Sequence, residues 1–526
     1  MTNSIKEIAD ADFICVFGSN TTETHPIISL QVKKAVREKG ATLVVIDPRQ
    51  TEISAIANHY LQLKAGTDVV LLNALANVII AEGLWDKEFV SMRTEGFDEL
   101  KKAVEPFTSE YAAGITGVPA NTIREVARGY AKAKNASILY TMGITQHVTG
   151  TDNVLAVANL AMLAGHIGKP SSGVNPLRGQ NNVQGACDMG GLPNVYTGYQ
   201  KVDDPAVQGK FEQAWKGSLP SKPGLTLGEM LDEAHHGKLK GLFILGENPI
   251  LSDPDYHHVV ASLKHVDFLV VQDIFLTETA QLADVVLPGA SFAEKDGTFS
   301  NTERRVQRVR KAIDPIGNSK ADWQIICEIA TAMGYRMSYE SPAAIMKEIA
   351  SLTPSYGGIT YERLEEGGLQ WPCPTADHPG TPYLHVGKFS RGLGKFSALA
   401  YRLPAELPDA EYPFLLNTGR RLFHYHTGSM TRRASGLDAI CPEEFLEVNP
   451  ADATKLGVSD GDTVKLVSRR GELEIKVQVT DRVMPGTVFA SFHFAEAAIN
   501  KLTNTDRDPV AKTPELKVCA VKIVKA

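Results

Sequence analysis

The sequence lacks several features that would assign it to a protein class at once, and paired cysteines are the first of them. Its six cysteines are scattered, and no two of them form a Cys-x-x-Cys pair. This spacing excludes a disulfide scaffold, a zinc ribbon and an iron–sulfur module built from these residues. It is typical of reduced thiols in a cytoplasmic protein, which is the location that we expect.

Long apolar runs and an excess of positive charge are missing as well. No stretch approaches the roughly 20 apolar residues of a membrane-spanning helix, and residues 1–7 have neither the basic nor the apolar part of a secretory signal. The formal net charge is -7, so the chain has no surplus of cations to neutralise nucleic-acid phosphates. We therefore expect a globular protein that binds no nucleic acid and spans no membrane.

The sequence does contain an α/β unit that occurs twice. Each copy runs strand, glycine turn, helix and second strand, and ends in an aspartate. The landmarks are 11–17, Gly18, Asn20, 41–46 and Asp47 in the first copy, and 241–245, Gly246, Asn248, 267–272 and Asp273 in the second. A glycine turn lets backbone N–H groups reach a phosphate, and a carboxylate at the next strand end can bind a ribose or a guanine edge.

Packing explains repeated apolar strands, but it gives no reason to repeat the polar positions. We therefore expect two nucleotide-bearing ligands, one for each copy. We also expect an approximate two-fold axis between the copies, with their polar strand ends facing a common cleft.

A polar, glycine-rich segment lies between the copies, at 175–190. It contains Arg178 and the amides Gln180, Asn181, Asn182 and Gln184, and it lacks apolar periodicity, so it predicts neither an ordinary core helix nor a core strand. Glycines let a ligand approach the backbone, and amides offer it donors and acceptors. The alternative is a polar linker, although linkers are usually rich in Ser, Pro or Lys instead.

This segment, Asn-Pro-Leu-Arg-Gly-Gln-Asn-Asn-Val-Gln-Gly-Ala-Cys-Asp-Met-Gly, resembles the active-site segment of molybdenum- or tungsten-dependent formate dehydrogenases of the dimethyl sulfoxide reductase family. The resemblance extends along essentially the whole chain. It implies a bis-molybdopterin guanine dinucleotide cofactor with Mo or W, and the oxidation of formate to carbon dioxide or the reverse reaction. It also implies an electron-transfer subunit with iron–sulfur clusters or flavin as a partner.

The resemblance assigns roles to particular residues. For the first dinucleotide they are Gly18, Asn20, Asp47, Arg49, Gly143 and Gln146; for the second they are Gly246, Glu247, Gln272 and Asp273. Further cofactor-binding positions are Gly66, Gly179, Asn181, Arg420, His424, Tyr425, Asn500 and Lys517. For the residues near the C-terminus, the alternative is an ordinary solvated surface.

Arg178 is the residue that we assign to the substrate. Its guanidinium is always charged and presents a fork of N–H groups that matches a carboxylate such as formate. Gln180 either assists it or binds a pterin. The alternative for Arg178 is a structural ion pair with an acidic residue.

The family also has features that this sequence does not contain. They are a metal-ligating cysteine or selenocysteine, and an N-terminal module with a 4Fe–4S cluster. We therefore expect these 526 residues to be a truncated reading of a longer selenoprotein that cannot oxidise formate alone. The alternatives are another molybdopterin oxidoreductase and a cofactor-binding fragment without activity.

The expected fold class is α/β with a C-terminal six-stranded β-barrel, the barrel following the family. We expect α/β domains at 1–180 and 181–300, each binding one dinucleotide, then a helical and loop connection at 301–400 and the barrel domain at 401–526. Apolar and capping patterns predict helices at 152–168, 322–333 and 449–457, and alternating patterns predict a hairpin at 460–467 and 472–479.

Overall fold

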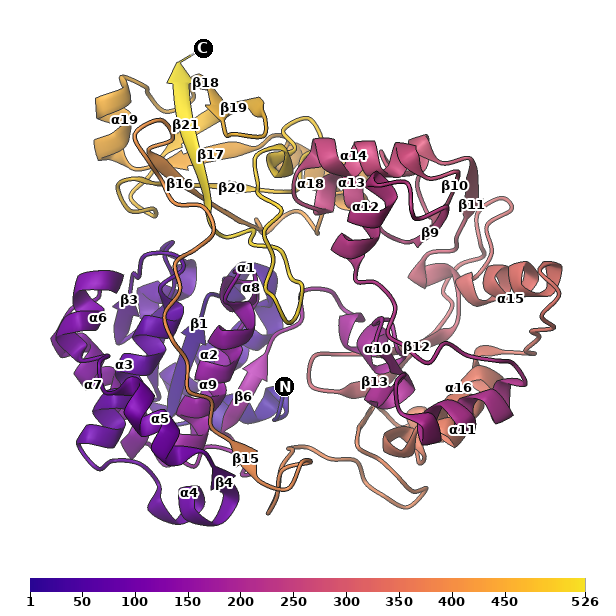
Figure 1. The fold of residues 1–526 in the computed structure, drawn as a ribbon, viewed down its shortest axis with the longest axis horizontal. Coiled ribbons are helices and arrows are strands. Elements are labelled where there is room, and N and C mark those ends of the chain that lie inside the picture. Colours follow the sequence, from indigo (N-terminus) through magenta and orange to yellow (C-terminus); the bar gives the residue numbers. More distant parts are fainter. Residues whose placement is uncertain (526) are drawn as a thin grey trace. The chain divides into compact units, whose positions relative to one another are not determined.

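The structure is a computed structural model, and it describes residues 1–525. The chain divides into two compact units. Unit 1 comprises Met1–Leu177, Leu251–His257 and the residues from Tyr383 onward, and unit 2 comprises Arg178–Ile250 and His258–Pro382. Figure 1 follows the chain from the indigo part of unit 1 through the magenta part of unit 2 and back to the yellow barrel of unit 1.

A parallel five-stranded sheet is the centre of the N-terminal part of unit 1. The strand order is β3-β2-β1-β5-β6, with β1 (Phe13–Phe17), β2 (Thr42–Ile46), β3 (His59–Leu61), β5 (Ala136–Tyr140) and β6 (Gly173–Pro176). All five residues of β1 are buried, as expected for a parallel strand covered on both faces. Phe13, Cys15 and Phe17 face one core, and Ile14 and Val16 face the other.

Helices cover the two faces of this sheet (Figure 1). They are α1 (Thr21–Thr24), α2 (Pro26–Lys39), α3 (Asp68–Ala81), α4 (Lys87–Arg93), α5 (Phe97–Val104), α6 (Ser109–Thr116), α7 (Ala120–Lys132), α8 (Met142–Thr145) and α9 (Gly150–Leu163). Helix α9 was expected at 152–168 but ends at Leu163. The reason is a left-handed Gly165 (φ 64), which ends the helix while the His166 N–H bonds to the Ala161 carbonyl.

The C-terminal part of unit 1 is a closed six-stranded barrel, as expected. Its order is β16-β20-β17-β19-β18-β21, with β16 (Phe414–Gly419), β17 (Phe445–Val448), β18 (Thr463–Val467), β19 (Glu472–Val479), β20 (Thr487–Ser491) and β21 (Cys519–Lys525). The predicted hairpin is the antiparallel pair β18 and β19. The barrel part also contains α18 (Ser435–Ile440) and α19 (Pro450–Leu456); the Asn449 side chain caps α19 by accepting from the Ala451 N–H.

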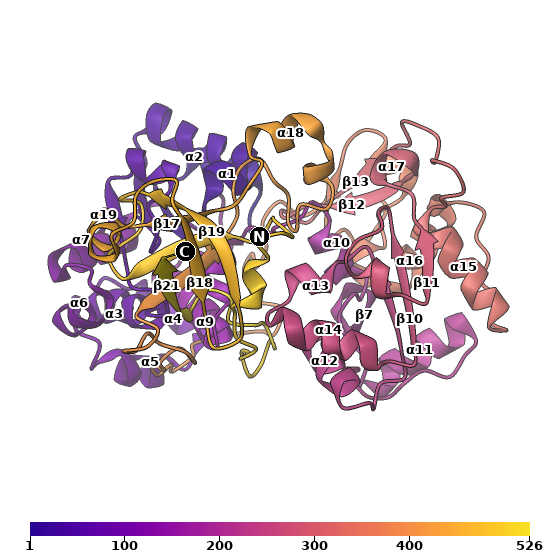
Figure 2. The ribbon, with the colours of Figure 1, turned by 90° about the horizontal axis from the view of Figure 1, so that it is seen from above.

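Unit 2 has a parallel sheet of its own, in the order β11-β10-β9, and Figure 2 labels β10 and β11 of this sheet. Its strands are β9 (Gly241–Leu245), β10 (Phe268–Asp273) and β11 (Val285–Pro288). Short antiparallel pairs are β7 (Val195–Tyr196) with β8 (Gln200–Lys201), and β12 (Gly297–Ser300) with β13 (Arg305–Val309) and β14 (Leu369–Gln370). A short parallel pair in unit 1 is β4 (Thr94–Glu95) with β15 (Gly394–Lys395).

The helices of unit 2 are mostly short. They are α10 (Val183–Asp188), α11 (Pro205–Trp215), α12 (Leu227–His235), α14 (Tyr256–His265), α15 (Asp322–Ala332), α16 (Pro342–Leu352) and α17 (Tyr361–Leu364); α13 (Pro249–Ser252) and α14 both cross the division between the units. Helix α15 confirms the prediction at 322–333. Helix α10 is a correction, because the polar segment at 175–190 was expected to contain no ordinary helix or strand, yet it holds α10 and the end of β6.

The internal repeat is confirmed by matching hydrogen bonds inside each unit. The Gly18 N–H donates to the Ile46 carbonyl at 2.9 Å, and the Gly246 N–H donates to the Gln272 carbonyl at 2.8 Å. Further along, Asn58 and Asp284 accept from the backbone of the second strand at 2.8 Å and 2.7 Å. The strand orders β3-β2-β1 and β11-β10-β9 also correspond. The two-fold relation between the copies stays a prediction.

Candidate functional site

Two glycine turns of unit 1 meet at the carboxyl ends of β1 and β5. The Gly143 N–H donates to the Gly18 carbonyl at 3.2 Å. A Cβ atom on Gly18 would lie 2.7 Å from the Gly143 Cα, and one on Gly143 would lie 2.5 Å from the Gly18 Cα. Both positions therefore require glycine, and the contact places two turns together at the sheet edge where α/β proteins bind ligands.

The turn after β1 buries polar atoms that have no hydrogen-bond partner within residues 1–525. They are Ser19 Oγ, both polar atoms of the Asn20 amide and Thr21 Oγ1. A buried polar group without a partner costs about 1–3 kcal/mol, and such groups are rare in native proteins. Four of them on one turn fit a ligand rich in donors and acceptors, such as a dinucleotide.

His147 adds an acceptor in the same unit. Its Nε2 lies 2.9 Å from the Gly143 carbonyl, and a carbonyl only accepts, so Nε2 carries the proton and Nδ1 is the acceptor. Nδ1 has no hydrogen-bond partner among the residues that the structure describes. Burial lowers the pKa of His147 to about 4, so the ring is neutral at pH 7.

Acidic and basic groups surround this part of unit 1. Burial raises the pKa of Asp47 to about 6, although the Arg49 N–H and the charges of Arg49 and Lys517 act in the opposite direction. Burial and the charge of Arg420 lower the pKa of Lys517 to about 8. The Lys517 ammonium donates to the Thr418 carbonyl at 2.6 Å. Asp47 and Lys517, which belong to different parts of the sequence, therefore share one electrostatic environment.

Other residues assigned to the cofactor already have protein partners in unit 1. Arg49 donates twice to Glu447, at 2.7 Å each. His424 uses both ring nitrogens, on the Cys441 carbonyl at 2.7 Å and the Thr431 hydroxyl at 3.2 Å. The Asn500 amide donates to the carbonyls of Leu251 and Ser252. These bonds are structural, and cofactor contacts of these three residues stay predictions.

The remaining positions assigned in unit 1 lie in loops or beside the barrel. A Cβ on Gly66, whose φ is 79, would lie 2.4 Å from Pro404 Cγ, so a packing reason for that glycine exists. Gln146 follows α8, and its N–H bonds to the Met142 carbonyl. Burial lowers the pKa of Arg420, and the Tyr425 N–H bonds to Thr431 Oγ1 at 3.1 Å. Their contacts with a cofactor stay predictions.

A buried carboxylate next to these groups makes the stability of unit 1 depend on pH. Burial raises the pKa of Asp68, the first residue of α3, to about 7, and the charge of Asp47 adds to this rise. The folded-state pKa is above the unfolded value of 3.8, so deprotonation destabilises the fold progressively as pH rises from about 4 to about 7. We expect Asp68→Asn to match wild type near pH 4 and to be more stable near pH 8, by up to about 4 kcal/mol.

Thermal unfolding at a series of pH values measures this effect. Asp98→Asn is the control, because Asp98 is an exposed carboxylate on α5. Equal unfolding midpoints of Asp68→Asn and wild type at pH 8 would show that Asp68 carries no such penalty.

The glycine turn of the second copy, in unit 2, has more free space around it than the turn at Gly18. Gly246 has a φ of 64, and a Cβ atom there would meet nothing within 4 Å. Glu247 is exposed. Gln272 is buried, and its amide donates to Asp322 at 2.7 Å while its Oε1 has no partner among the described residues. Asp273 accepts from the backbone N–H groups of Ile274 and Phe275.

Arg178 opens unit 2 and leads into α10. Its N–H donates to Thr302 Oγ1 at 3.0 Å, and its Nε donates to Gln184 Oε1 at 3.2 Å. Gly179, Gln180 and Asn181 follow Arg178 in the chain; Gln180 is half-buried and Asn181 is exposed. These two bonds go to a hydroxyl and an amide, and the substrate role of Arg178 stays a prediction.

The sequence did not indicate that Asp188 and several aromatic residues form a hydrogen-bond network with Gln184. Asp188 is buried on the same helix, and it accepts hydrogen bonds from Gln184, Tyr199, Tyr356 and Trp371. The one signal in the sequence was the spacing of four between Gln184 and Asp188, which places both on one helix face.

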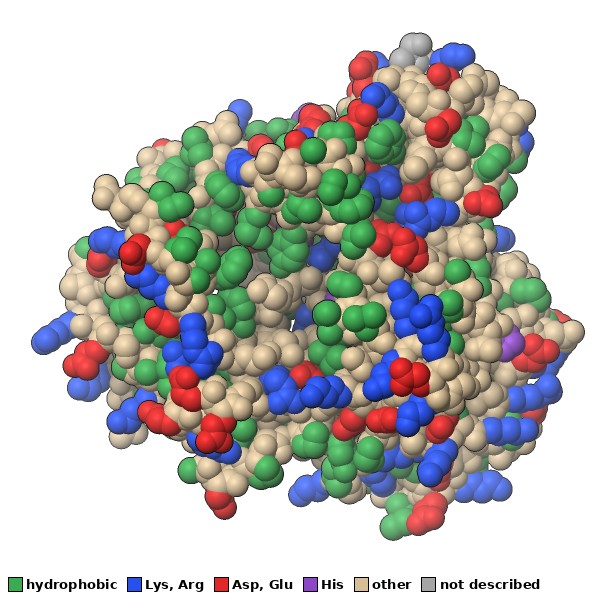
Figure 3. Space-filling view, turned by 180° about the vertical axis from the view of Figure 1, so that it is seen from behind, with side chains coloured by type: hydrophobic (Ala, Val, Ile, Leu, Met, Phe, Trp, Pro, Cys, Tyr) green, Lys and Arg blue, Asp and Glu red, His purple; other side chains and the backbone are tan. Residues whose placement is uncertain are grey.

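Two kinds of feature are absent from residues 1–525. Within residues 1–525, no group of three or more His, Cys, Asp or Glu side chains is arranged to hold a metal ion. No helix in the same residues combines the length and the apolar character needed to cross a membrane. Figure 3 shows acidic and basic side chains interspersed over the face in view.

The comparisons with known proteins agree with this arrangement. A model of the family described as molybdopterin oxidoreductase matches residues 1–332, and a model of a molydopterin dinucleotide binding domain matches residues 414–520. The chain belongs to the molybdopterin oxidoreductase family.

Several relatives are similar over the whole chain. The F420-dependent formate dehydrogenase subunit alpha of Methanocaldococcus jannaschii is 54% identical over 99% of this chain and 78% of its own length. Formate dehydrogenase H of Escherichia coli is 44% identical over 99% of this chain and 74% of its own length. Among solved structures, acetylene hydratase from Pelobacter acetylenicus has a TM-score of 0.78 at 20% identity, covering 100% of this chain and 81% of that one; this shows the shared fold.

Proposed function

We propose that this chain is the larger part of a formate dehydrogenase alpha subunit, which oxidises formate to carbon dioxide at a bis-molybdopterin guanine dinucleotide centre with Mo or W. One observation carries this proposal. Arg178 lies in a polar loop, and its guanidinium is oriented by the Gln184 amide. The chain around it is 54% identical to a formate dehydrogenase subunit alpha over 99% of this chain. A fixed guanidinium is the group best suited to hold a small carboxylate.

The residues of the chain would bind the cofactor and orient the substrate. In unit 1, the buried polar atoms of Ser19, Asn20 and Thr21, together with His147 Nδ1, would hold one dinucleotide. In unit 2, the open turn at Gly246 and the Oε1 of Gln272 would hold the other. When bound, the cofactor supplies the two-electron chemistry that side chains cannot provide. Arg178 would hold the formate oxygens by charge-assisted hydrogen bonds and so fix the direction of its C–H bond.

The finer assignments follow the resemblance. We propose that the metal ligand, a cysteine or selenocysteine, and a 4Fe–4S cluster come from polypeptide outside these 526 residues. We also propose an electron-transfer subunit with iron–sulfur clusters or flavin as the partner. A cytoplasmic location is supported by the cysteines, all six of which are free thiols.

A dye-reduction assay tests the proposed activity. The holoenzyme that contains this chain, with Mo or W and pterin content measured, should reduce an artificial dye when formate is added. A fully loaded holoenzyme that reduces no dye with formate, but does so with another substrate, would assign the chain to another activity of the family.

The glycine contact of unit 1 predicts a loss of cofactor. In Gly18→Ala, the new methyl group would lie 2.7 Å from the Gly143 backbone, so the two turns must separate and the cradle must open. We expect pterin and metal content to fall at least about tenfold, because a shift of this kind removes several hydrogen bonds at once. Pterin fluorescence after extraction and metal analysis measure the two contents.

Gly40→Ala is the matched control for this variant. Gly40 also has a positive φ, 69, but a Cβ atom there would meet nothing within 4 Å. The two variants therefore share the backbone strain and differ in the contact. Equal cofactor contents in Gly18→Ala and Gly40→Ala would contradict a dinucleotide site at this turn.

A further inference from the structure

Asp188 is a buried carboxylate at the centre of unit 2, and its exposure is 0%. Its Oδ1 accepts from Gln184 Nε2 at 2.7 Å and from the Tyr199 hydroxyl at 2.9 Å. Its Oδ2 accepts from the Tyr356 hydroxyl and the Trp371 indole N–H, at 2.6 Å each. All four donors are neutral. These four hydrogen bonds use acceptor sites on both oxygens of the buried side chain.

The carboxylate fixes the orientation of the Gln184 amide. A glutamine amide has one end that donates and one end that only accepts. Because Asp188 occupies the donating end, the oxygen of Gln184 must face the other way, and it lies 3.2 Å from Arg178 Nε. If the amide were reversed, two donors would face each other at Arg178 and two acceptors at Asp188. The acceptor position of Asp188 thus determines that Gln184 presents its oxygen to Arg178 Nε.

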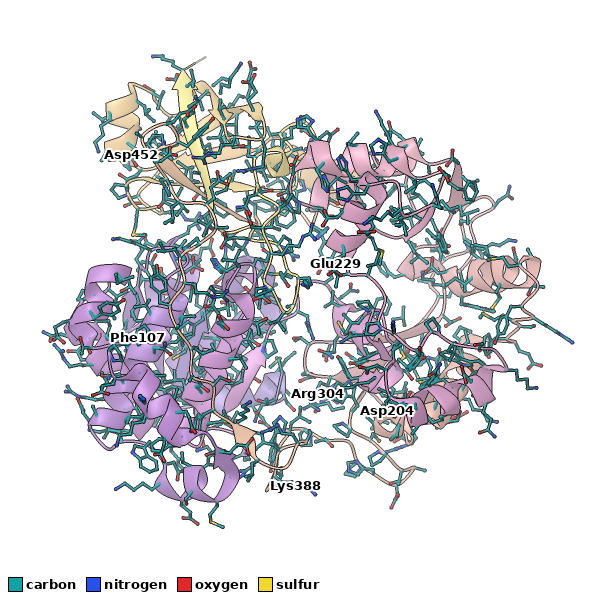
Figure 4. The ribbon with its side chains drawn as sticks, viewed as in Figure 1. Phe107, Asp204, Glu229, Arg304, Lys388 and Asp452 are labelled. Atoms are coloured by element: carbon teal, nitrogen blue, oxygen red, sulfur yellow. The ribbon has the colours of Figure 1, made fainter. Side chains whose placement is uncertain are left out.

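Asp188 is itself held firmly by residues distant in the sequence. The Tyr356 hydroxyl also lies 3.3 Å from Ser300 Oγ. The buried guanidinium of Arg304, labelled in Figure 4, lies over the Trp371 ring at 5.6 Å and donates to the Thr381 carbonyl at 3.1 Å. Tyr199 has a φ of 61, a conformation that non-glycine residues rarely adopt and that persists only when contacts hold it.

We propose that Asp188 is a positioning residue for substrate binding, which acts through Gln184 to set the plane of the Arg178 guanidinium. The inference rests on the proposed function, because it names formate as the anion that Arg178 holds. Neither Asp188 nor Gln184 needs to touch the substrate. The rotation of a guanidinium decides whether its N–H groups match a carboxylate. The hydrogen bonds of Asp188 and Gln184 therefore affect the binding of formate more than they affect its oxidation.

Asp188→Asn tests the proposal with little change of shape. Asparagine has one acceptor oxygen, so the donors on one side of Asp188 would face an NH₂ group instead. We expect Gln184 to reorient and the KM for formate to rise roughly tenfold, as for the loss of one hydrogen bond to a charged group, with cofactor content unchanged. Formate oxidation by the wild-type holoenzyme tests the proposed function separately. A wild-type KM in a loaded Asp188→Asn holoenzyme would overturn the positioning role.

Glu348→Gln is the matched control. Glu348 is also a carboxylate of unit 2 that accepts from an indole and a phenol, those of Trp215 at 3.0 Å and Tyr339 at 2.8 Å. Neither of these two hydrogen bonds involves Arg178. A general loss of packing would affect both variants alike, whereas positioning predicts a raised KM only in Asp188→Asn.

Two further measurements distinguish positioning from a structural role. In an Arg178→Lys background, Asp188→Asn should add little to the KM, because the group it acts on is gone; additive effects would contradict the proposal. The Arg178 Nε–H resonance, assigned by its loss in Arg178→Lys, should shift in Asp188→Asn and stay in place in Glu348→Gln, whatever the activity. If Asp188→Asn does not fold, Gln184→Met replaces it, and an unchanged resonance and KM there would overturn the proposal.

Discussion

Arg178→Lys is expected to lower kcat/KM for formate by roughly 10- to 100-fold in the holoenzyme, with metal and pterin content at the wild-type level. Lysine keeps the positive charge but loses the planar fork that binds both oxygens of a carboxylate. A hydrogen bond to a charged group contributes about 1.5–3 kcal/mol, and each 1.4 kcal/mol is a factor of ten. Steady-state kinetics with varied formate measure the effect.

The control for this variant is another arginine of the same unit. Arg310→Lys changes a residue that is 55% exposed and pairs with Glu365 at 2.6 Å. It should leave formate kinetics unchanged. If the fully metallated Arg178→Lys enzyme has wild-type kinetics, Arg178 does not bind the substrate.

The α/β sheets could be predicted because their signals are local. The apolar run of β1, the aspartate after β2 and the aspartate that ends β10 follow from short stretches of sequence. The glycine turns are required by a backbone contact and by positive φ angles. Because the unit occurs twice, the prediction for each copy supported the prediction for the other. The polar ends of the strands were therefore found without knowledge of any side-chain contact.

The site itself was predicted only in part, because its supporting contacts join residues that are far apart in the chain. Asp188 meets Tyr356 and Trp371, which are 168 and 183 residues away. No periodicity or spacing connects such positions. The same limit concealed the partner of Arg49, since Glu447 lies 398 residues away. The resemblance assigned Arg49 to the cofactor, and that assignment stays a prediction.

Helix α10 shows a different limit. Its sequence, Val183–Asp188, has no apolar stripe, so periodicity gave no helix. The buried face of this helix is polar. Gln184 donates to Asp188 and to the Tyr199 hydroxyl, and Asp188 accepts from the same hydroxyl. A polar face that is satisfied by side-chain hydrogen bonds replaces the apolar face that sequence patterns detect.

Glu447→Gln is expected to cause the largest loss of stability, about 3–5 kcal/mol, because it breaks a buried ion pair from one side. Glu447 on β17 has 0% exposure and Arg49, which follows β2, has 5%. Arg49 also lies over the Phe489 ring at 4.1 Å, and Arg421 donates to Glu447 at 3.3 Å. With glutamine present, an NH₂ group would face these cations, and a buried guanidinium would lose half of its acceptors.

The pH dependence of this loss identifies the ion pair as its cause. Burial alone would raise the pKa of Glu447, but the hydrogen bonds and charge of Arg49 outweigh it and lower the pKa. A lowered folded-state pKa stabilises the fold above the ordinary glutamate range and loses that contribution as pH falls through the folded value. Thermal unfolding should therefore separate wild type and Glu447→Gln at pH 7, and the difference should shrink in acid. Glu82→Gln is the control, because it breaks an exposed pair with Arg128 that has two bonds, at 2.8 Å and 2.7 Å. It should leave the unfolding midpoint almost unchanged. Equal midpoints for the two variants would show that burial does not increase the contribution of the Arg49–Glu447 pair to stability.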